Sequence, residues 1–296
     1  MGSPDFSLPV LRTLAKIYNV VGVITQPDRA SGRGRELKSP PVKLLAQELN
    51  LPILQPEKLK QPEAMQQLRA WSPDLIVVAA FGQILKKDVL DLPRYGCVNV
   101  HASLLPRWRG AAPINASILH GDEETGVTIM QMDVGLDTGP MLAKQSIRLT
   151  RDDTAGSVFE ALSTLGADLL IETLPDYLSG KLVPTSQPEE GATYAPMMKK
   201  EDGKLDFNSD VIELERRVRA FNPWPGAFMD FDGVVLKVHR AHVEQGNASA
   251  GQRLIVQNQP AVGVRGGILV LDEVQPAGKK SMSGKSFLAG TRNWAE

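Results

Sequence analysis

The sequence is poor in cysteine and has no long apolar run. Cys97 is the one cysteine among 296 residues, which excludes an internal disulfide and argues against a cysteine-based metal site. No stretch approaches the ~20 apolar residues of a membrane span, and the N-terminus lacks the basic region and apolar core of a signal peptide. With 42% hydrophobic and 23% charged residues, the composition is that of an ordinary globular protein, which we expect to be cytoplasmic.

An excess of charge of either sign is also missing. The 33 Lys and Arg residues nearly balance the 34 Asp and Glu residues, so the net charge is -1 and any binding to nucleic acid must come from local clustering of positive side chains. His120, His239 and His242 have no carboxylate or cysteine partners at ligand spacing. We therefore predict no metal site.

The first part of the chain alternates short apolar runs with helical patterns, which is typical of βαβ units. The predicted strands cover residues 19–25, 74–80, 97–101 and 126–132, and the predicted helices cover residues 7–18, 41–50 and 62–71. Val158, Leu162, Leu165 and Leu169 repeat at three and four, which predicts a longer helix. We expect a Rossmann-like, doubly wound parallel sheet in a domain that spans residues 1–180.

The second part of the chain has a different pattern. Residues 181–199 are rich in Pro, Gln, Thr and Glu without periodicity, which predicts a linker. Residues 200–296 form the second predicted domain, in which a helix at 211–221 precedes short strands at 226–231, 234–239, 253–256 and 267–271. This pattern favours a small β-barrel.

Three polar side chains suit acyl chemistry. Asn99 and His101 alternate with valines in the 97–101 strand and so point to the same side, while Asp137 lies on a glycine-flanked turn. An amide can hold a carbonyl oxygen as it becomes an oxyanion, an imidazole can move a proton, and a carboxylate can orient and support the imidazole. Taken singly, each of these residue types more often forms a turn or a satisfied buried polar group.

A family resemblance favours the catalytic interpretation. Asn99-Val-His101, the run from Ser103 to Pro113, and Gly126 to Gly139 with its Asp133-Val-Gly-Leu-Asp137-Thr-Gly segment are similar to the methionyl-tRNA formyltransferase signature. The resemblance implies that Asn99, His101 and Asp137 transfer a formyl group from 10-formyltetrahydrofolate to the α-amine of methionyl initiator tRNA, without metal. It also implies an OB-fold-like C-terminal domain that binds tRNA, and we expect a monomer.

The folate co-substrate would lie against two loops. The resemblance places Ser103, Leu104, Leu105 and Pro106 along its pocket, since apolar side chains with free backbone groups suit a flat pteridine. The loop with Phe81, Gly82 and Ile84 is a second candidate wall. Ser103 could instead be a turn hydroxyl, and Phe81 and Ile84 could instead pack a strand against a helix.

Two basic groups are candidates for tRNA binding. The first is a glycine-rich loop with Arg29, Arg33, Arg35 and Lys38, in which glycines flank Arg33; the resemblance makes Arg33 the leading contact with the acceptor end. From the residues alone it could also be a solvated loop or a phosphate cradle. The second group contains Lys279 and Lys280, with Lys285 nearby, although surface lysines often serve solubility alone.

The chain departs from the family at its start. In the family that the chain resembles, a strand of about six residues precedes this turn, whereas here Met1 comes directly before the Gly2-Ser-Pro-Asp-Phe6 turn. In a doubly wound sheet the first strand is central. Without it, we expect two neighbouring strands with unpaired edges and a slot that nothing fills.

Two other functions remain possible from the sequence. A formyltransferase acting on a nucleotide-sugar amine or on glycinamide ribonucleotide would share the Asn-His-Asp trio, but it would need neither the basic loop nor the second domain. A non-catalytic RNA-binding protein would need no trio.

Overall fold

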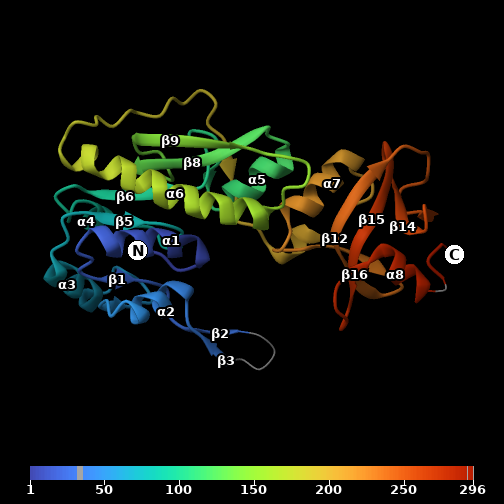
Figure 1. Cartoon of the computed structure of the whole chain (residues 1–296), viewed down its shortest axis with the longest axis horizontal. Helices are drawn as coiled ribbons and strands as arrows, with labels where there is room; N and C mark the ends of the chain where they lie inside the picture. The colour runs from blue at the N-terminus through green and yellow to red at the C-terminus, as the bar shows by residue number, and fades with distance from the viewer. Residues whose placement is uncertain (32–35, 292, 296) are drawn as a thin grey trace. The chain divides into compact units, whose positions relative to one another are not determined.

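The computed structural model describes residues 1–31, 36–291 and 293–295. The chain forms two compact units (Figure 1). The N-terminal unit consists of Met1–Gly110, Thr125–Ile147 and Phe159–Tyr194. The C-terminal unit consists of Ala111–Glu124, Arg148–Val158 and Ala195–Glu296. Among the described helices, none is long and apolar enough to cross a membrane.

The N-terminal unit carries a mixed sheet. Its helical segments are η1 (Asp5–Ser7), α1 (Leu8–Ile17), α2 (Pro41–Glu48), α3 (Pro62–Trp71), α4 (Lys87–Leu90) and most of α6 (Ala155–Leu178). Its strands are β1 (Val23–Ile24), β2 (Arg29–Ser31), β3 (Glu36–Lys38), β4 (Ile53–Leu54), β5 (Ile76–Val78), β6 (Cys97–His101), β7 (Arg109–Gly110), β8 (Glu124–Gln131) and β9 (Met141–Arg148). Strands β5, β6, β8 and β9 pair in that order, and β1 pairs with β4.

The prediction of a parallel sheet is correct for only part of these strands. The pairs β1–β4 and β5–β6 are parallel, but β8 runs antiparallel to β6, with Thr128 opposite His101. A parallel neighbour would require the chain to cross to the far end of the sheet before pairing again. Here the chain leaves β6 at His101, and β8 begins beside this same end of β6. Strand β8 must therefore run in the opposite direction.

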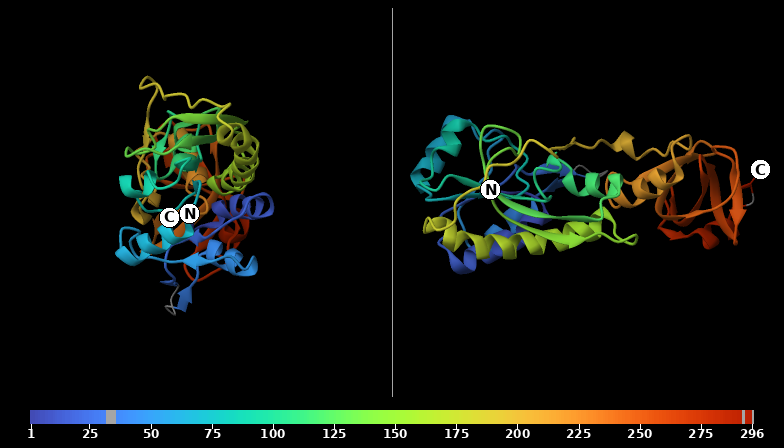
Figure 2. Two further views of the ribbon diagram at one scale, coloured as in Figure 1. Left: turned by 90° about the vertical axis from the view of Figure 1, so that its left-hand side faces the viewer. Right: turned by 90° about the horizontal axis from the view of Figure 1, so that it is seen from above.

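Helix α6 covers one face of this sheet (Figures 1 and 2). Gly166 lies so close to the sheet that a Cβ atom there would be 2.6 Å from Val100 Cγ1. On the same helix, Ser163 donates a hydrogen bond to Phe6 O and Phe159 packs edge-on against the Phe6 ring. The helix thus ties the sheet to the η1 turn.

An apolar cavity of about 500 Å³ lies among β1, β5 and the segments that precede them. Met1 and Gly2 close one end of it, since the Met1 amino group donates to Val77 O at 2.6 Å and Gly2 N donates to Ile24 O at 3.1 Å. Ala79 N donates back to Met1 O at 2.9 Å. Within the described residues, β1 and β5 belong to separate sheets. The cavity lies beside β1 and β5, in the part of the sheet where the sequence predicts a slot.

Strands β2 and β3 form a hairpin that projects from the N-terminal unit (Figure 1). Its base is held by Asp28, whose carboxylate accepts hydrogen bonds from Gln55, Lys43 and Ser39. The hydrogen bond from Gln55 and the contact with Lys43 hold the pKa of Asp28 below its ordinary value. The hairpin is therefore anchored where it leaves the unit.

The C-terminal unit is built around antiparallel strands. It contains α5 (Pro113–His120), η2 (Lys200–Gly203), α7 (Val211–Ala220), α8 (Gly284–Ala289), β11 (Ala227–Phe231), β12 (Val234–Glu244), β13 (Arg253–Val256), β14 (Gln259–Val264), β15 (Gly267–Pro276) and β16 (Met282–Ser283), while β10 (Tyr194–Ala195) lies at its start. The sheet order is β11-β12-β15-β14-β13, and β16 pairs with β15.

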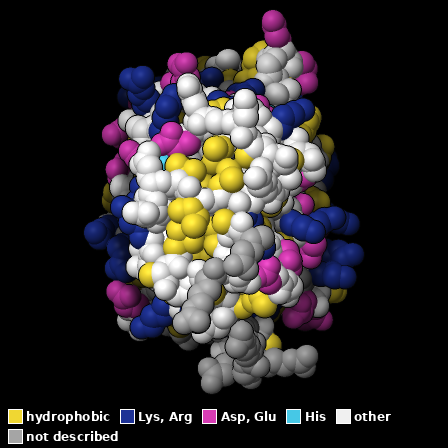
Figure 3. Space-filling model, turned by 90° about the vertical axis from the view of Figure 1, so that its right-hand side faces the viewer, with side chains coloured by type: hydrophobic (Ala, Val, Ile, Leu, Met, Phe, Trp, Pro, Cys, Tyr) yellow, Lys and Arg dark blue, Asp and Glu magenta, His cyan; other side chains and the backbone are white. Residues whose placement is uncertain are grey.

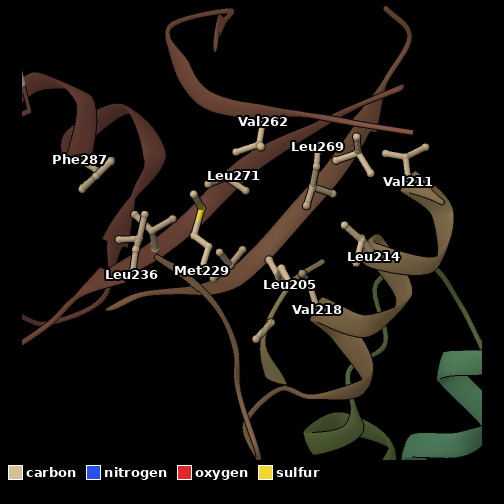
Figure 4. Packing of buried hydrophobic residues seen from close by; sticks show 14 of the residues in the cluster. Leu205, Val211, Leu214, Val218, Met229, Leu236, Val262, Leu269, Leu271 and Phe287 are labelled. Carbon is tan, nitrogen blue, oxygen red and sulfur yellow. The ribbon is translucent and has the colours of Figure 1, made fainter. Parts of the chain in front are cut away.

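The core of this unit lies between α7 and the sheet (Figure 4). Leu214 and Val218 of α7 are fully buried and pack with Leu205, Met229 and Leu269. The side chain of Asp210 accepts a hydrogen bond from Ile212 N and so caps the start of the helix. The predicted helix and strands of this region are present, and β14 was not predicted.

Candidate active site

Strand β6 places two polar side chains in a buried position. Asn99 is 9% exposed and His101 is 5% exposed, while Val98 and Val100, which alternate with them, are fully packed. Thr128 lies opposite His101 on β8 and is also buried. The strand therefore presents an amide and an imidazole side by side at the carboxyl end of a strand.

Asp137 reaches this strand from a compact loop. The carboxylate of Asp133 accepts hydrogen bonds from Gly135 N at 3.0 Å and Thr138 Oγ1 at 2.8 Å, which folds the loop on itself. Asp137 itself has a φ of 53°, in the left-handed region. Such a backbone costs most residues about 1–2 kcal/mol, and Asn and Asp tolerate it best. The position thus suits an aspartate.

The carboxylate of Asp137 lies against both side chains of β6. Asn99 Nδ2 donates to Asp137 Oδ1 at 3.4 Å, and His101 Nδ1 lies 3.7 Å from Asp137 Oδ2. Gly110 N donates to the same Oδ2 at 2.9 Å. The three side chains that the sequence singles out therefore meet at one place, and a backbone amide from β7 joins them.

The two nitrogens of His101 have different surroundings. Nε2 lies 3.0 Å from Trp108 O, and because a carbonyl can only accept, Nε2 carries a proton. Nδ1 faces the Asp137 carboxylate. This arrangement fixes the orientation of the ring.

The loop after β6 is held in shape by buried hydrogen bonds. Ser103 Oγ donates to Arg107 O at 2.6 Å, as expected of a turn hydroxyl. Thr128 Oγ1 donates to Ser103 O and accepts from Leu105 N. Leu105 is fully buried, whereas Leu104 and Pro106 are partly exposed. Of this group, Leu104 and Pro106 have side-chain surface that a ligand could contact.

The second loop predicted to line the folate pocket, with Phe81, Gly82 and Ile84, also has both buried and exposed residues. The Phe81 side chain is 3% exposed and packs in a core cluster with Ile24 and Leu85. Ile84 is 88% exposed, and Gly82 has a φ of 76°. Phe81 therefore packs the strand end, whereas Gly82 and Ile84 present accessible surface.

The predicted tRNA contacts lie in both units. Arg29 and Lys38 are exposed and face each other across the β2–β3 hairpin, while Arg33 and Arg35 lie outside the described residues. Lys279 and Lys280 are exposed in the turn between β15 and β16. Figure 3 shows one face over the C-terminal unit, where hydrophobic side chains lie in the middle and both signs of charge lie around them.

The segment before β10, which the sequence predicts as a linker, contributes contacts that sequence reasoning missed. Thr185 exchanges two backbone hydrogen bonds with Met141 at the start of β9. Thr193 Oγ1 accepts from Trp108 N at 2.9 Å, and Thr193 O accepts from Arg109 N at 2.9 Å. We call residues 185–193 the strap. Its polar composition without periodicity indicates an irregular segment. This pattern does not predict the hydrogen bonds to Met141, Trp108 and Arg109.

Comparison with known proteins identifies relatives over nearly the whole chain. The family model for formyl transferase matches residues 10–174, and that for the formyl transferase C-terminal domain matches residues 197–292. The methionyl-tRNA formyltransferase of Myxococcus xanthus is 49% identical over 98% of this chain and 93% of its own length.

Solved structures share the fold at low sequence identity. Methionyl-tRNA formyltransferase from Clostridium thermocellum superposes with a TM-score of 0.57 at 20% identity, over 87% of this chain and 99% of its own. The N-formyltransferase of Helicobacter canadensis, in complex with folinic acid and dTDP-3-aminofucose, superposes with a TM-score of 0.66 at 16% identity, over 93% of this chain and 97% of its own.

Proposed function

The chain belongs to the family of methionyl-tRNA formyltransferases, and we propose that Asn99, His101 and Asp137 carry its reaction. The enzyme transfers a formyl group from 10-formyltetrahydrofolate to the α-amine of methionine on initiator tRNA. The observation that supports the assignment of residues is the convergence of the trio, in which the amide and the imidazole flank one carboxylate.

The reaction makes one bond and breaks another at the formyl carbon. The amine nitrogen attacks that carbon, and the carbonyl electron pair moves onto oxygen. Collapse of the tetrahedral oxyanion then breaks the bond to N10, which takes up a proton as the amine loses one. Transfer is direct, so no covalent enzyme intermediate is required, which agrees with the turn role of Ser103 Oγ.

Each side chain of the trio has a place in this sequence. Asn99 would donate its amide N–H to the oxyanion. His101, with Nε2–H held by Trp108 O, would exchange a proton through Nδ1. Asp137 would hold the imidazole in place and assist transfer of the proton from the attacking amine. Gly110 N–H holds the Asp137 carboxylate in place by donating to Oδ2.

The folate and the tRNA would contact further residues. We assign the folate to the accessible surface of Leu104, Pro106, Gly82 and Ile84. The exposed Arg29 and Lys38 lie on the hairpin that leads to Arg33, which supports a tRNA contact there. The antiparallel sheet of the C-terminal unit, with its exposed Lys279, would act as an OB-fold-like tRNA-binding domain over residues 200–296.

An assay of radiolabelled formyl transfer tests this function. The purified protein is given 10-formyltetrahydrofolate with methionyl initiator tRNA, methionyl elongator tRNA or a nucleotide-linked amino sugar. We expect rapid formylation of the initiator alone. Preferred transfer to the amino sugar, whose N-formyltransferases share the fold, would contradict the assignment.

A further inference from the structure

The backbone of Asp137 is held by a residue of the strap. Gln187 Nε2 donates to Asp137 O and to Gly139 O, both at 2.8 Å. These two carbonyls flank Thr138, so the single amide group bridges the turn that carries the carboxylate. Because the φ of Asp137 is left-handed, the turn needs such partners to persist in this conformation.

Arg109 determines which way the Gln187 amide faces. Arg109 Nε donates to Gln187 Oε1 at 3.1 Å. A guanidinium only donates, so the amide oxygen must face Arg109 and the amide NH₂ must face the two carbonyls. The Arg109 side chain is 1% exposed. Among the described residues its Nη2 has no hydrogen-bond partner, and it lies 3.6 Å from Oε1 of the exposed Glu189. A cation buried this deeply is costly, so its position must be strongly held.

Strand β7 thus reaches Asp137 by two routes. Gly110 N donates to the Asp137 carboxylate, while the preceding residue, Arg109, holds the Asp137 carbonyl through Gln187. The first contact orients the side chain, and the second fixes the backbone from which it projects. A displacement of 1 Å at a reacting group is enough to slow catalysis greatly.

We propose that Gln187 is a positioning residue for Asp137, with Arg109 fixing its amide, and that the strap is part of the active-site framework. The proposal rests on the proposed function, since it assumes that Asp137 acts in formyl transfer. Gln187 itself would touch neither the folate nor the tRNA. Its loss should therefore lower kcat and leave both KM values nearly unchanged.

Two variants of similar size separate the donor role from packing. Gln187→Glu keeps an acceptor for Arg109 but loses both donors, and Gln187→Met loses every polar contact. We expect both to lower kcat by about 10-fold or more, with each KM within about 2-fold of the parent value. Gln66→Glu and Gln66→Met, at an exposed position on α3 away from the site, are the matched controls and should keep the parental kcat.

The outcomes distinguish the possible failures. Parental turnover in Gln187→Glu with a loss in Gln187→Met would show that the contact with Arg109 matters and the carbonyl contacts do not, which overturns the proposal. A raised KM at unchanged kcat would make Gln187 a substrate contact and would overturn it as well. An inactive parent would instead refute the proposed function. The melting temperature of each variant should lie within a few degrees of that of the parent, which would show that the fold is kept.

Discussion

Asn99 and Asp137 are joined by a hydrogen bond of 3.4 Å between Nδ2 and Oδ1. The contact links a strand to a loop that lies far along the chain, and it places an amide donor beside a carboxylate in a buried setting. A contact at the long end of the hydrogen-bond range leaves the amide free to turn to another acceptor. That property suits the role proposed for Asn99, a donor to an oxyanion that exists only during the reaction.

Removal of a trio member should lower turnover. We expect His101→Ala, Asp137→Asn and Asn99→Ala each to reduce kcat by ~10²-fold or more, because proton transfer and oxyanion support act in the transition state. Asp137→Asn is chosen because asparagine also tolerates a left-handed backbone. Steady-state kinetics test this, with the exposed Asp176→Asn as control. A variant with near-normal turnover would remove that residue from the mechanism.

Arg33 should govern the choice of tRNA. We expect discrimination of initiator from elongator tRNA to use the acceptor stem, where a planar guanidinium can stack on or bond to bases of an opened terminal pair. We expect Arg33→Ala to lose most formylation of methionyl initiator tRNA and Arg33→Lys to lose a substantial part. Hydrolysis of 10-formyltetrahydrofolate, measured in parallel, should proceed at nearly the same rate in both variants as in the parent. If Arg33→Ala used initiator tRNA as well as the parent, the role proposed for Arg33 in recognition would be refuted.

Lys279 should behave as a phosphate contact. Its exposed ammonium group in the turn after β15 can neutralise one phosphate and release a counterion. We expect Lys279→Ala to weaken tRNA binding modestly and to reduce the slope of log K against log salt by about 1. Binding titrations at several salt concentrations measure both. An unchanged slope would show that Lys279 lies off the tRNA path.

Filling the slot beside β1 and β5 should raise stability. Six apolar residues with strand propensity, added ahead of Met1, could pair with both edges and occupy the cavity of about 500 Å³. Each kcal/mol gained should raise the melting temperature by roughly 2–4 °C in a chain of this size. A six-residue Gly/Ser extension is the control. Equal melting temperatures for the two extensions would mean that the cavity is no strand site.

Cys97 should be inert in the folded chain. Burial raises the pKa of its thiol from 9.0 to about 12, so almost no thiolate is present near pH 8. Thiol reagents should label it only on unfolding. Between pH 9 and 12 the folded chain keeps a proton that the unfolded chain has lost, so this contribution to stability falls as pH rises. The decrease in the free energy of unfolding between pH 9 and 12 should be smaller in Cys97→Ala than in the parent. Rapid labelling of the native parent by a thiol reagent would contradict the burial of Cys97.

Local patterns predict those elements that depend on local sequence. Strand β6 and helix α3 have the predicted bounds, since alternation and helical spacing are expressed within each segment. The strand predicted at residues 19–25 is reduced to Val23–Ile24, and both of these residues pair with β4. The residues of the site also divide into those that a local pattern predicts and those that depend on partners far along the chain. Asn99 and His101 share a strand face by alternation, whereas Gln187 reaches Asp137 through contacts that no local period encodes.

The two units are interleaved along the chain, which limits how they can be exchanged between relatives. Helix α5 belongs to the C-terminal unit, where Asn115 Nδ2 donates to Ala220 O at 2.6 Å at the end of α7. Residues 148–158 belong there as well, and Arg219 Nη1 donates to Asp153 O at 3.1 Å. A C-terminal fragment or chimera that begins after residue 194 would lack α5 and residues 148–158, the two segments that hydrogen-bond to α7 and to its C-terminal end. A functional graft must carry residues 111–124 and 148–158 together with the C-terminal sequence.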